Sequence, residues 1–95
     1  MDNSREYVVA FDVTENGERR RVNKVLKRHG IRVQKSVFEV RMTKGVRQRL
    51  LHDLNALELE SGFILMYRLQ ANGTREVVGV PPGDLHDESR PAFVV

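Results

Sequence analysis

The sequence predicts a single α+β domain in which two helices cover one face of a small antiparallel sheet. Apolar, β-branched runs alternate along the chain with two stretches of helical periodicity, and an Asn-Gly pair near residue 72 is typical of a hairpin turn. With 95 residues, 40% of them hydrophobic, the chain is long enough to build one modest core.

The first half of the chain predicts a strand followed by a helix. The run Tyr7–Val13 (YVVAFDV) is apolar and β-branched, which favours a central strand, and Asn16-Gly17 is expected to end it. From Glu18 to His29, apolar residues recur at helical spacing with basic residues on the opposite side. Gly30 follows, where a helix commonly ends on a left-handed residue.

The second half predicts further strands around a second helix. Ile31–Met42 alternates and is β-rich, so it forms one bent strand or two short strands that meet near Lys35-Ser36. Thr43 is the expected N-cap of a helix whose apolar face comprises Val46, Leu50, Leu54 and Leu57. Phe63–Gln70 is then a strand, and the turn at Asn72-Gly73 pairs it with Thr74–Val80.

The order of these elements is βαββαβ with an extra C-terminal strand, which is the ferredoxin-like arrangement. Residues 1–80 are expected to form the domain, and residues 81–95 a C-terminal tail. Most of the aromatic residues, Phe63 and Tyr67 among them, are expected in the core. The sheet face without helices predicts a homodimer surface, with the Thr74–Val80 strand exchanged between copies. The apolar end of the tail, Ala92–Val95, is expected to add an edge strand to a partner.

The charges are distributed unevenly along the chain. Between Arg19 and Arg49 there are twelve Lys or Arg residues and one acid, whereas the remainder of the chain is net acidic. So basic a block predicts a polyanion partner, because neutralising phosphates releases counterions. The absence of cysteine excludes zinc-thiolate sites and fits a reducing compartment. No apolar run is long enough to cross a bilayer and no secretion signal is visible, so a cytoplasmic protein without a membrane partner is expected.

Two stretches of the chain resemble the CRISPR-associated protein two family. One is Phe11-Asp12-Val13 followed by an Arg-rich helix start, and the other is GIRVQKSVFEVRMT, residues 30–43. The resemblance implies a homodimer that binds double-stranded DNA as an adaptor for the CRISPR integrase subunit during spacer acquisition. Some family members are metal-dependent nucleases, on RNA or on double-stranded DNA, so enzymatic activity is left open. The matched motifs place the functional positions of the family at Asp12, Arg19, Arg21, Arg32, Ser36 and Phe38.

Asp12 is the candidate catalytic and metal-binding residue. One carboxylate is not sufficient for a metal site, but a two-fold axis would bring a second Asp12 to it, and Mg²⁺ suits such a site. The alternative is that Asp12 caps the turn into the first helix and is neutralised by Arg19 or Arg21. If Asp12 binds the metal, the protein is a Mg²⁺-dependent endonuclease. The competing function is a toxin-like ribonuclease of the same fold that acts alone.

Several cations are candidates for binding nucleic acid. Arg20 and Lys24 lie on the outer face of the first predicted helix, where simple solvation is the alternative. Lys44 and Arg47 fall in the first turn of the second helix, where cations oppose the helix dipole unless an anion binds there. The candidate nucleic-acid-binding residues are therefore Arg19, Arg20, Arg21, Lys24, Arg32, Lys44 and Arg47. Ser36 and Phe38 are assigned structural or dimer-packing roles.

Overall fold

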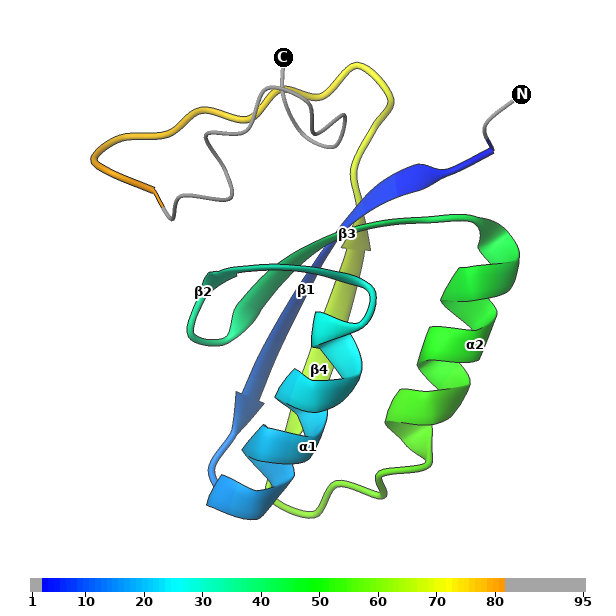
Figure 1. Cartoon of the computed structure of the whole chain (residues 1–95), viewed down its shortest axis with the longest axis vertical. Helices are drawn as coiled ribbons and strands as arrows, with labels where there is room; N and C mark the ends of the chain where they lie inside the picture. The colour runs from blue at the N-terminus through cyan, green and yellow to red at the C-terminus, as the bar shows by residue number, and fades with distance from the viewer. Residues whose placement is uncertain (1–2, 82–95) are drawn as a thin grey trace.

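The computed structural model describes residues 3–81. The elements follow in the order β1 (Arg5–Val13), α1 (Asn16–Lys27), β2 (Gly30–Gln34), β3 (Val37–Met42), α2 (Lys44–Asn55) and β4 (Gly62–Arg68). The strands form one sheet in the order β2-β3-β1-β4, with antiparallel neighbours throughout, and both helices lie on the same side of it (Figure 1). This is the ferredoxin-like fold that the sequence predicts. None of the described helices has the length and apolarity needed to cross a bilayer.

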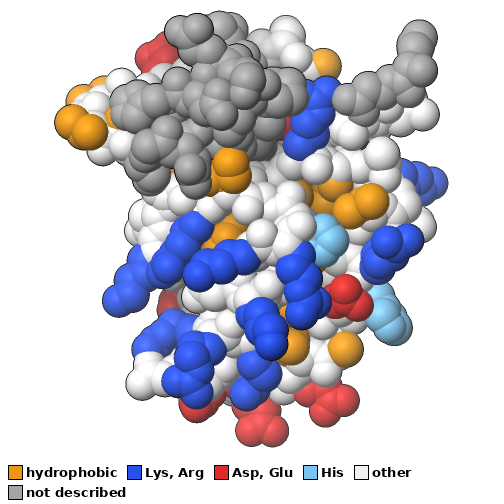
Figure 2. Space-filling view, in the orientation of Figure 1, with side chains coloured by type: hydrophobic (Ala, Val, Ile, Leu, Met, Phe, Trp, Pro, Cys, Tyr) orange, Lys and Arg blue, Asp and Glu red, His pale blue; other side chains and the backbone are white. Residues whose placement is uncertain are grey.

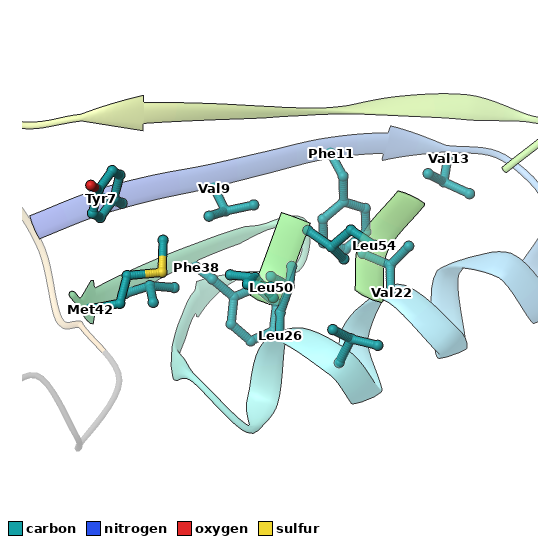
Figure 3. Close-up of a cluster of buried hydrophobic side chains, with 12 residues drawn as sticks. Tyr7, Val9, Phe11, Val13, Val22, Leu26, Phe38, Met42, Leu50 and Leu54 are labelled. Atoms are coloured by element: carbon teal, nitrogen blue, oxygen red, sulfur yellow. The ribbon is translucent and has the colours of Figure 1, made fainter. Parts of the chain in front are cut away.

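The core lies between β1, β3 and the two helices. Successive side chains of a strand point to opposite faces, and in β1 the buried residues are Tyr7, Val9, Phe11 and Val13. Figure 3 shows them directed toward the apolar side chains of α1 and α2. The intervening residues of β1 therefore face away from the helices. The other core residues are Val22, Val25, Leu26, Phe38, Val40, Met42, Leu50 and Leu54.

The first helix starts two residues earlier than predicted. Asn16 and Gly17 are its first residues, because the Glu15 carboxylate accepts the backbone N–H groups of Gly17 and Glu18 and so caps the helix. A glutamate at this position was not recognised as a cap in the sequence. Asn16-Gly17 therefore belongs to the helix and does not form a separate turn.

Gly30 is also misassigned by the sequence. It does not adopt a left-handed conformation; within residues 3–81 the glycine with positive φ is Gly79. Gly30 is instead the first residue of β2, where an added Cβ would lie 2.3 Å from the carbonyl oxygen of Glu39 and 2.6 Å from Cγ2 of Val40. The close approach of β2 to β3 requires glycine at this position.

The predictions for the β2–β3 hairpin and α2 are confirmed. Ile31–Met42 forms two strands with the turn at Lys35-Ser36, and the Thr43 hydroxyl caps α2 by accepting the N–H of Val46. Leu50 and Leu54 are buried on the inner face of α2, while Leu57 packs on the core from beyond the end of the helix.

The predicted hairpin between Phe63–Gln70 and Thr74–Val80 is wrong for the single chain. The turn forms, since Gly73 N–H donates to the Gln70 carbonyl at 2.9 Å, but residues 74–80 form no strand. We call residues 74–81 the strap. It runs from the end of β4 toward the side of the molecule where β2 lies (Figure 1). Arg75 in this segment pairs with Glu39 of β3. The predicted edge strand at Ala92–Val95 lies outside the described residues.

Candidate functional site

Asp12 lies near the end of β1 on the sheet face that carries no helix. Its neighbours Phe11 and Val13 are buried against the helices, whereas Asp12 is exposed. The carboxylate therefore projects from the uncovered face. The alternative role that the sequence left open, capping the first helix, belongs to Glu15.

The backbone after Asp12 is held by a dense set of hydrogen bonds. Thr14 donates its N–H and its hydroxyl to the Ser61 carbonyl, each at 3.2 Å, and Glu15 N–H donates to the Ser61 hydroxyl at 3.0 Å. Glu18 in turn accepts the Ser61 hydroxyl, the Ser61 N–H at 3.0 Å and the Glu60 N–H at 2.9 Å. The start of α1 is thus tied to the loop before β4.

These hydrogen bonds favour the ionised form of two carboxylates. The Ser61 hydroxyl, assisted by the N–H groups of Glu60 and Ser61, lowers the pKa of Glu18 below its ordinary value. The N–H of Glu18, followed by that of Gly17, lowers the pKa of Glu15 in the same way. Both glutamates are occupied by backbone donors, so they serve the fold at this end of the sheet.

Gly62 allows β4 to approach Asp12 closely. Gly62 pairs with Val13, and Phe63 with Asp12. A Cβ on Gly62 would lie 1.8 Å from the carbonyl oxygen of Asp12 and 2.8 Å from the Cα of Val13. The position of Asp12 therefore depends on a glycine that the sequence analysis did not single out. Nothing in the local pattern identifies it, because the contact is made by a residue distant in the sequence.

A cationic hollow lies on the opposite, helical side of the sheet, between α1 and β2. It has a volume of about 600 Å³ and is lined by Gly17, Arg20, Arg21, Asn23, Lys24, Lys27 and Arg32. Figure 2 shows Lys and Arg side chains gathered over this side of the molecule. Arg32 reaches it from β2 because its strand partner is Phe38, whose side chain is buried beneath the helices.

The hollow brings together four of the predicted nucleic-acid-binding residues: Arg20, Arg21, Lys24 and Arg32. It adds Lys27, to which the sequence analysis assigned no role. Local spacing could have identified it, since residues 20, 24 and 27 follow the helical repeat. Five cations on one concave surface form a site suited to phosphates, for which Arg and Lys are the usual ligands.

The remaining predicted cations do not line the hollow. Nη1 of Arg19 donates to the carbonyls of Val13 at 3.2 Å and Thr14 at 2.8 Å, so this side chain caps the end of β1. Lys44 is exposed at the start of α2. Arg47 is half-buried, and its Nε makes no hydrogen bond within the described part of the chain.

Ser36 and Phe38 both support the sheet. The Ser36 carbonyl accepts the N–H of Phe11 at 3.0 Å, which extends the pairing of β1 with the β2–β3 turn. Phe38 is fully buried under the helices, so it belongs to the core and not to an outer surface.

The uncovered face is apolar at its β4 side. Phe63, Leu65 and Tyr67 are 54%, 44% and 58% exposed there, opposite Asp12, Ala10 and Val8 of β1. The expectation that Phe63 and Tyr67 are core residues is therefore wrong. Successive side chains of β4 point to opposite faces of the sheet. Those of Phe63 and Tyr67 point to the face without helices.

A magnesium site is not complete in one chain. Within residues 3–81, no three His, Asp or Glu side chains are grouped closely enough to hold a metal ion. The single carboxylate of Asp12 does not fit Mg²⁺ by itself, since hydrolytic metal sites draw on several ligands. A second Asp12 carboxylate would have to contribute a ligand. It would come from another copy of the chain whose uncovered sheet face meets this one.

The fold and the two faces define a small domain with a cationic surface on one side and an exposed apolar sheet with a lone carboxylate on the other. Residues 5–77 match the family model described as CRISPR associated protein Cas2. The chain belongs to this family.

Curated relatives and solved structures agree with the family. The chain is 41% identical over 51 residues to a protein of Rhodospirillum rubrum named CRISPR-associated endoribonuclease Cas2 4, a match that covers 54% of this chain and 41% of that protein. It is 30% identical over 63 residues to the CRISPR-associated endoribonuclease Cas2 of Mycobacterium tuberculosis, covering 66% and 56% of the two chains. The matched segments thus span about half the length of these relatives.

Among solved structures, a hypothetical protein, TT1823, of Thermus thermophilus superimposes with a TM-score of 0.76 at 32% identity, covering 83% of this chain and 95% of that one. Cas2 of Streptococcus pyogenes superimposes with a TM-score of 0.65 at 28% identity, covering 70% and 88%.

Proposed function

We propose that this protein is a homodimeric adaptor that binds double-stranded DNA for the CRISPR integrase during spacer acquisition. The observation that carries the proposal is the separation of two surfaces. The cationic hollow lies on the helical side, and the exposed apolar residues lie on the opposite side of the sheet. One surface suits a phosphate backbone and the other suits a second copy of the chain.

This separation allows dimerisation and DNA binding to occur together. Two copies that meet through their uncovered faces keep their basic surfaces apart, so the like charges do not repel across the interface. The dimer then displays two cationic hollows on its outer sides. A duplex bound there is held by its backbone, and its sequence is not read.

Salt-dependent binding tests the proposal. If each of the five cations in the hollow neutralises one phosphate, the slope of log affinity against log salt is about −4.5, or roughly a 500-fold loss between 50 and 200 mM salt. Replacing Arg20 and Lys24 with Gln should reduce the slope to about −2.7. Arg5→Gln with Arg28→Gln makes the same change of charge outside the hollow and is the matched control. Equal slopes for the two double variants would show that the hollow does not bind the duplex.

The names of the curated relatives, which are endoribonucleases, favour a second candidate function, cleavage of RNA, and we propose that it would depend on Mg²⁺. Asp12 would provide its carboxylate, and bound Mg²⁺ would activate water. Because Asp12 and the hollow do not share a face, the hollow cannot place a phosphate beside the Asp12 of the same chain. Cleavage would require an RNA that contacts the interface between two copies.

A nuclease assay separates the two candidates. Purified wild-type protein and Asp12→Ala are incubated with RNA and with duplex DNA, with and without Mg²⁺. Activity that requires both Mg²⁺ and Asp12 would establish the enzyme. Equal cleavage by the two proteins would indicate contamination, and DNA binding without cleavage would leave the adaptor as the function.

Docking of the integrase is proposed to involve the C-terminal tail. Truncation after Pro82 should leave the dimer and DNA binding intact but reduce integrase capture in a pull-down. Undiminished capture by the truncated protein would exclude the tail as the docking element.

A further inference from the structure

The cationic hollow between α1 and β2 carries charge that the described part of the protein does not neutralise. Its five cations are exposed, and no acidic residue among residues 3–81 lines it. None of the five forms an ion pair within these residues. Because like charges held close together repel, a bound anion would stabilise this surface.

The attraction is centred away from one end of the hollow. A Cβ on Gly17 would lie 3.0 Å from Oε1 of Glu15 and 3.5 Å from Nη1 of Arg21, so the Glu15 carboxylate lies at the Arg21 end. The charge of Arg21 is thus partly offset. The other four cations, three on α1 and Arg32 on β2, provide most of the attraction.

Arg32 is oriented before any ligand binds. Its Nη2 donates to the carbonyl of Lys35, in the turn after β2, at 3.1 Å. A guanidinium is planar, so fixing one N–H also fixes the directions of the others. Arg32 therefore forms a prepared wall of the hollow, facing the more flexible cations of α1.

Asn23 adds a feature that phosphate binding does not use. It lies on the same face of α1 as Arg20 and Lys27, and it is half-buried whereas the cations are exposed. Its Nδ2 donates to the carbonyl of Arg19 at 3.0 Å, but its buried Oδ1 accepts no hydrogen bond within the described part of the chain. A buried acceptor without a donor is unfavourable. Arg20 and Lys27 flank Asn23 along the helix, so their movement onto a bound phosphate would uncover this oxygen.

The backbone of duplex DNA does not suit this acceptor. Phosphate oxygens only accept hydrogen bonds, and deoxyribose lacks the 2′-hydroxyl, whereas a ribose hydroxyl or the amino group of an unpaired base can donate. The volume of about 600 Å³ lies within the range of small-molecule pockets, about 300–1,000 Å³. A compact ligand with several phosphates and a donor group uses the hollow more fully than the convex surface of a duplex does.

We propose that the cationic hollow binds a free nucleoside polyphosphate and that this nucleotide competes with DNA. Its phosphates contact Arg20, Lys24 and Arg32, and its sugar or base donates to Oδ1 of Asn23. The nucleotide then occupies cations that a duplex needs, so the two ligands exclude each other. The competition rests on the DNA binding of the proposed function, whereas the nucleotide site does not.

Isothermal titration calorimetry in EDTA tests the site, with ATP and inorganic tripolyphosphate as separate probes. Asn23→Leu should raise the Kd for ATP about fivefold, the effect of losing one hydrogen bond, and leave that for tripolyphosphate unchanged. Asn55→Leu is the matched control, because Nδ2 of Asn55 makes the same kind of hydrogen bond, to the Leu51 carbonyl at 2.9 Å, outside the hollow. An unchanged Kd for ATP in Asn23→Leu would overturn the contact to the nucleoside.

Removing charge tests the phosphate contacts. Arg20→Gln with Lys24→Gln should raise the Kd values for both probes at least about tenfold, since both probes use the same cations. Arg5→Gln with Arg28→Gln makes the same change of charge outside the hollow and should leave them nearly unchanged. Equal losses in the two double variants would show diffuse attraction to a basic surface and would overturn the site.

Competition is measured by the fluorescence polarisation of a labelled duplex at constant ionic strength. ATP should displace the duplex at concentrations near its own Kd, and Asn23→Leu should require about fivefold more ATP with no change in duplex affinity. A protein that binds the duplex but not ATP would refute the nucleotide site and leave the proposed function standing. A protein that binds ATP but not the duplex would refute the DNA-binding function and leave the site, and simultaneous binding of both ligands would refute the competition.

Discussion

The close approach of Gly62 to Asp12 gives a quantitative prediction for Gly62→Ala. The new Cβ would lie 1.8 Å from the Asp12 carbonyl oxygen, a backbone atom that cannot rotate away. Extra atoms in a packed site lower the free energy of unfolding by about 1–3 kcal/mol. Because the new Cβ would contact backbone, we expect a loss near the upper value, about 3 kcal/mol. For a domain of this size, that corresponds to a fall in Tm of roughly 12–24 °C.

The assay is urea and thermal unfolding followed by circular dichroism, with Gly45→Ala as the control. Gly45 is the second residue of α2 and an added Cβ would meet no atom within 4 Å, so alanine should stabilise the protein by up to about 1 kcal/mol through its higher helix propensity. Gly62→Ala and Gly45→Ala are thus the same chemical change, but the expected changes in the free energy of unfolding have opposite signs. A Gly62→Ala variant as stable as the wild type would show that β4 does not approach Asp12 as described.

The other predictions concern the elements that support the site. Because the folded pKa of Glu18 is lowered, its carboxylate stabilises the fold above the ordinary pKa of 4.5 and loses this effect as the pH falls below it. Glu18→Gln should therefore be less stable than the wild type at neutral pH, with the difference shrinking toward about pH 3 in urea titrations; a constant difference would contradict this. Thr43→Ala removes the cap of α2 and should cost about 1 kcal/mol, whereas Thr43→Ser should cost little. Leu50→Ala creates a cavity in the core and should cost about 2–5 kcal/mol without changing the salt dependence of DNA binding, and a change in that dependence would argue against a purely structural role.

The alternation of β3 connects packing to function. The hollow depends on Arg32, which faces α1 because its strand partner Phe38 is buried in the core. Glu39, the next residue along β3, faces the other side and pairs with Arg75. The alternation of a single strand thus separates the proposed DNA surface from the proposed dimer surface.

The sequence by itself determined the types and order of the elements from β1 to β4. Each is encoded by local composition, periodicity or a local capping group, as in the apolar, β-branched run Tyr7–Val13 and the hydroxyl of Thr43. The basic character of α1 was visible for the same reason, because residues 20, 24 and 27 recur at helical spacing. Asp12 could be identified as a candidate from its position after a buried strand, and the family resemblance gave the same residue.

Only the tertiary structure decided which surfaces these residues form. Glu18 is tied to Ser61 across a sequence separation of 43 residues, and Gly62 meets Asp12 across the sheet, so no local pattern contains either contact. Strand alternation shows that two sets of side chains face opposite ways, but the side on which the helices pack determines which set is buried, and this left Phe63 and Tyr67 exposed. The turn at Asn72-Gly73 formed as its residues predict, yet residues 74–80 form no strand in the single chain. Arg75 instead pairs with Glu39 of β3, a contact that no local pattern contains.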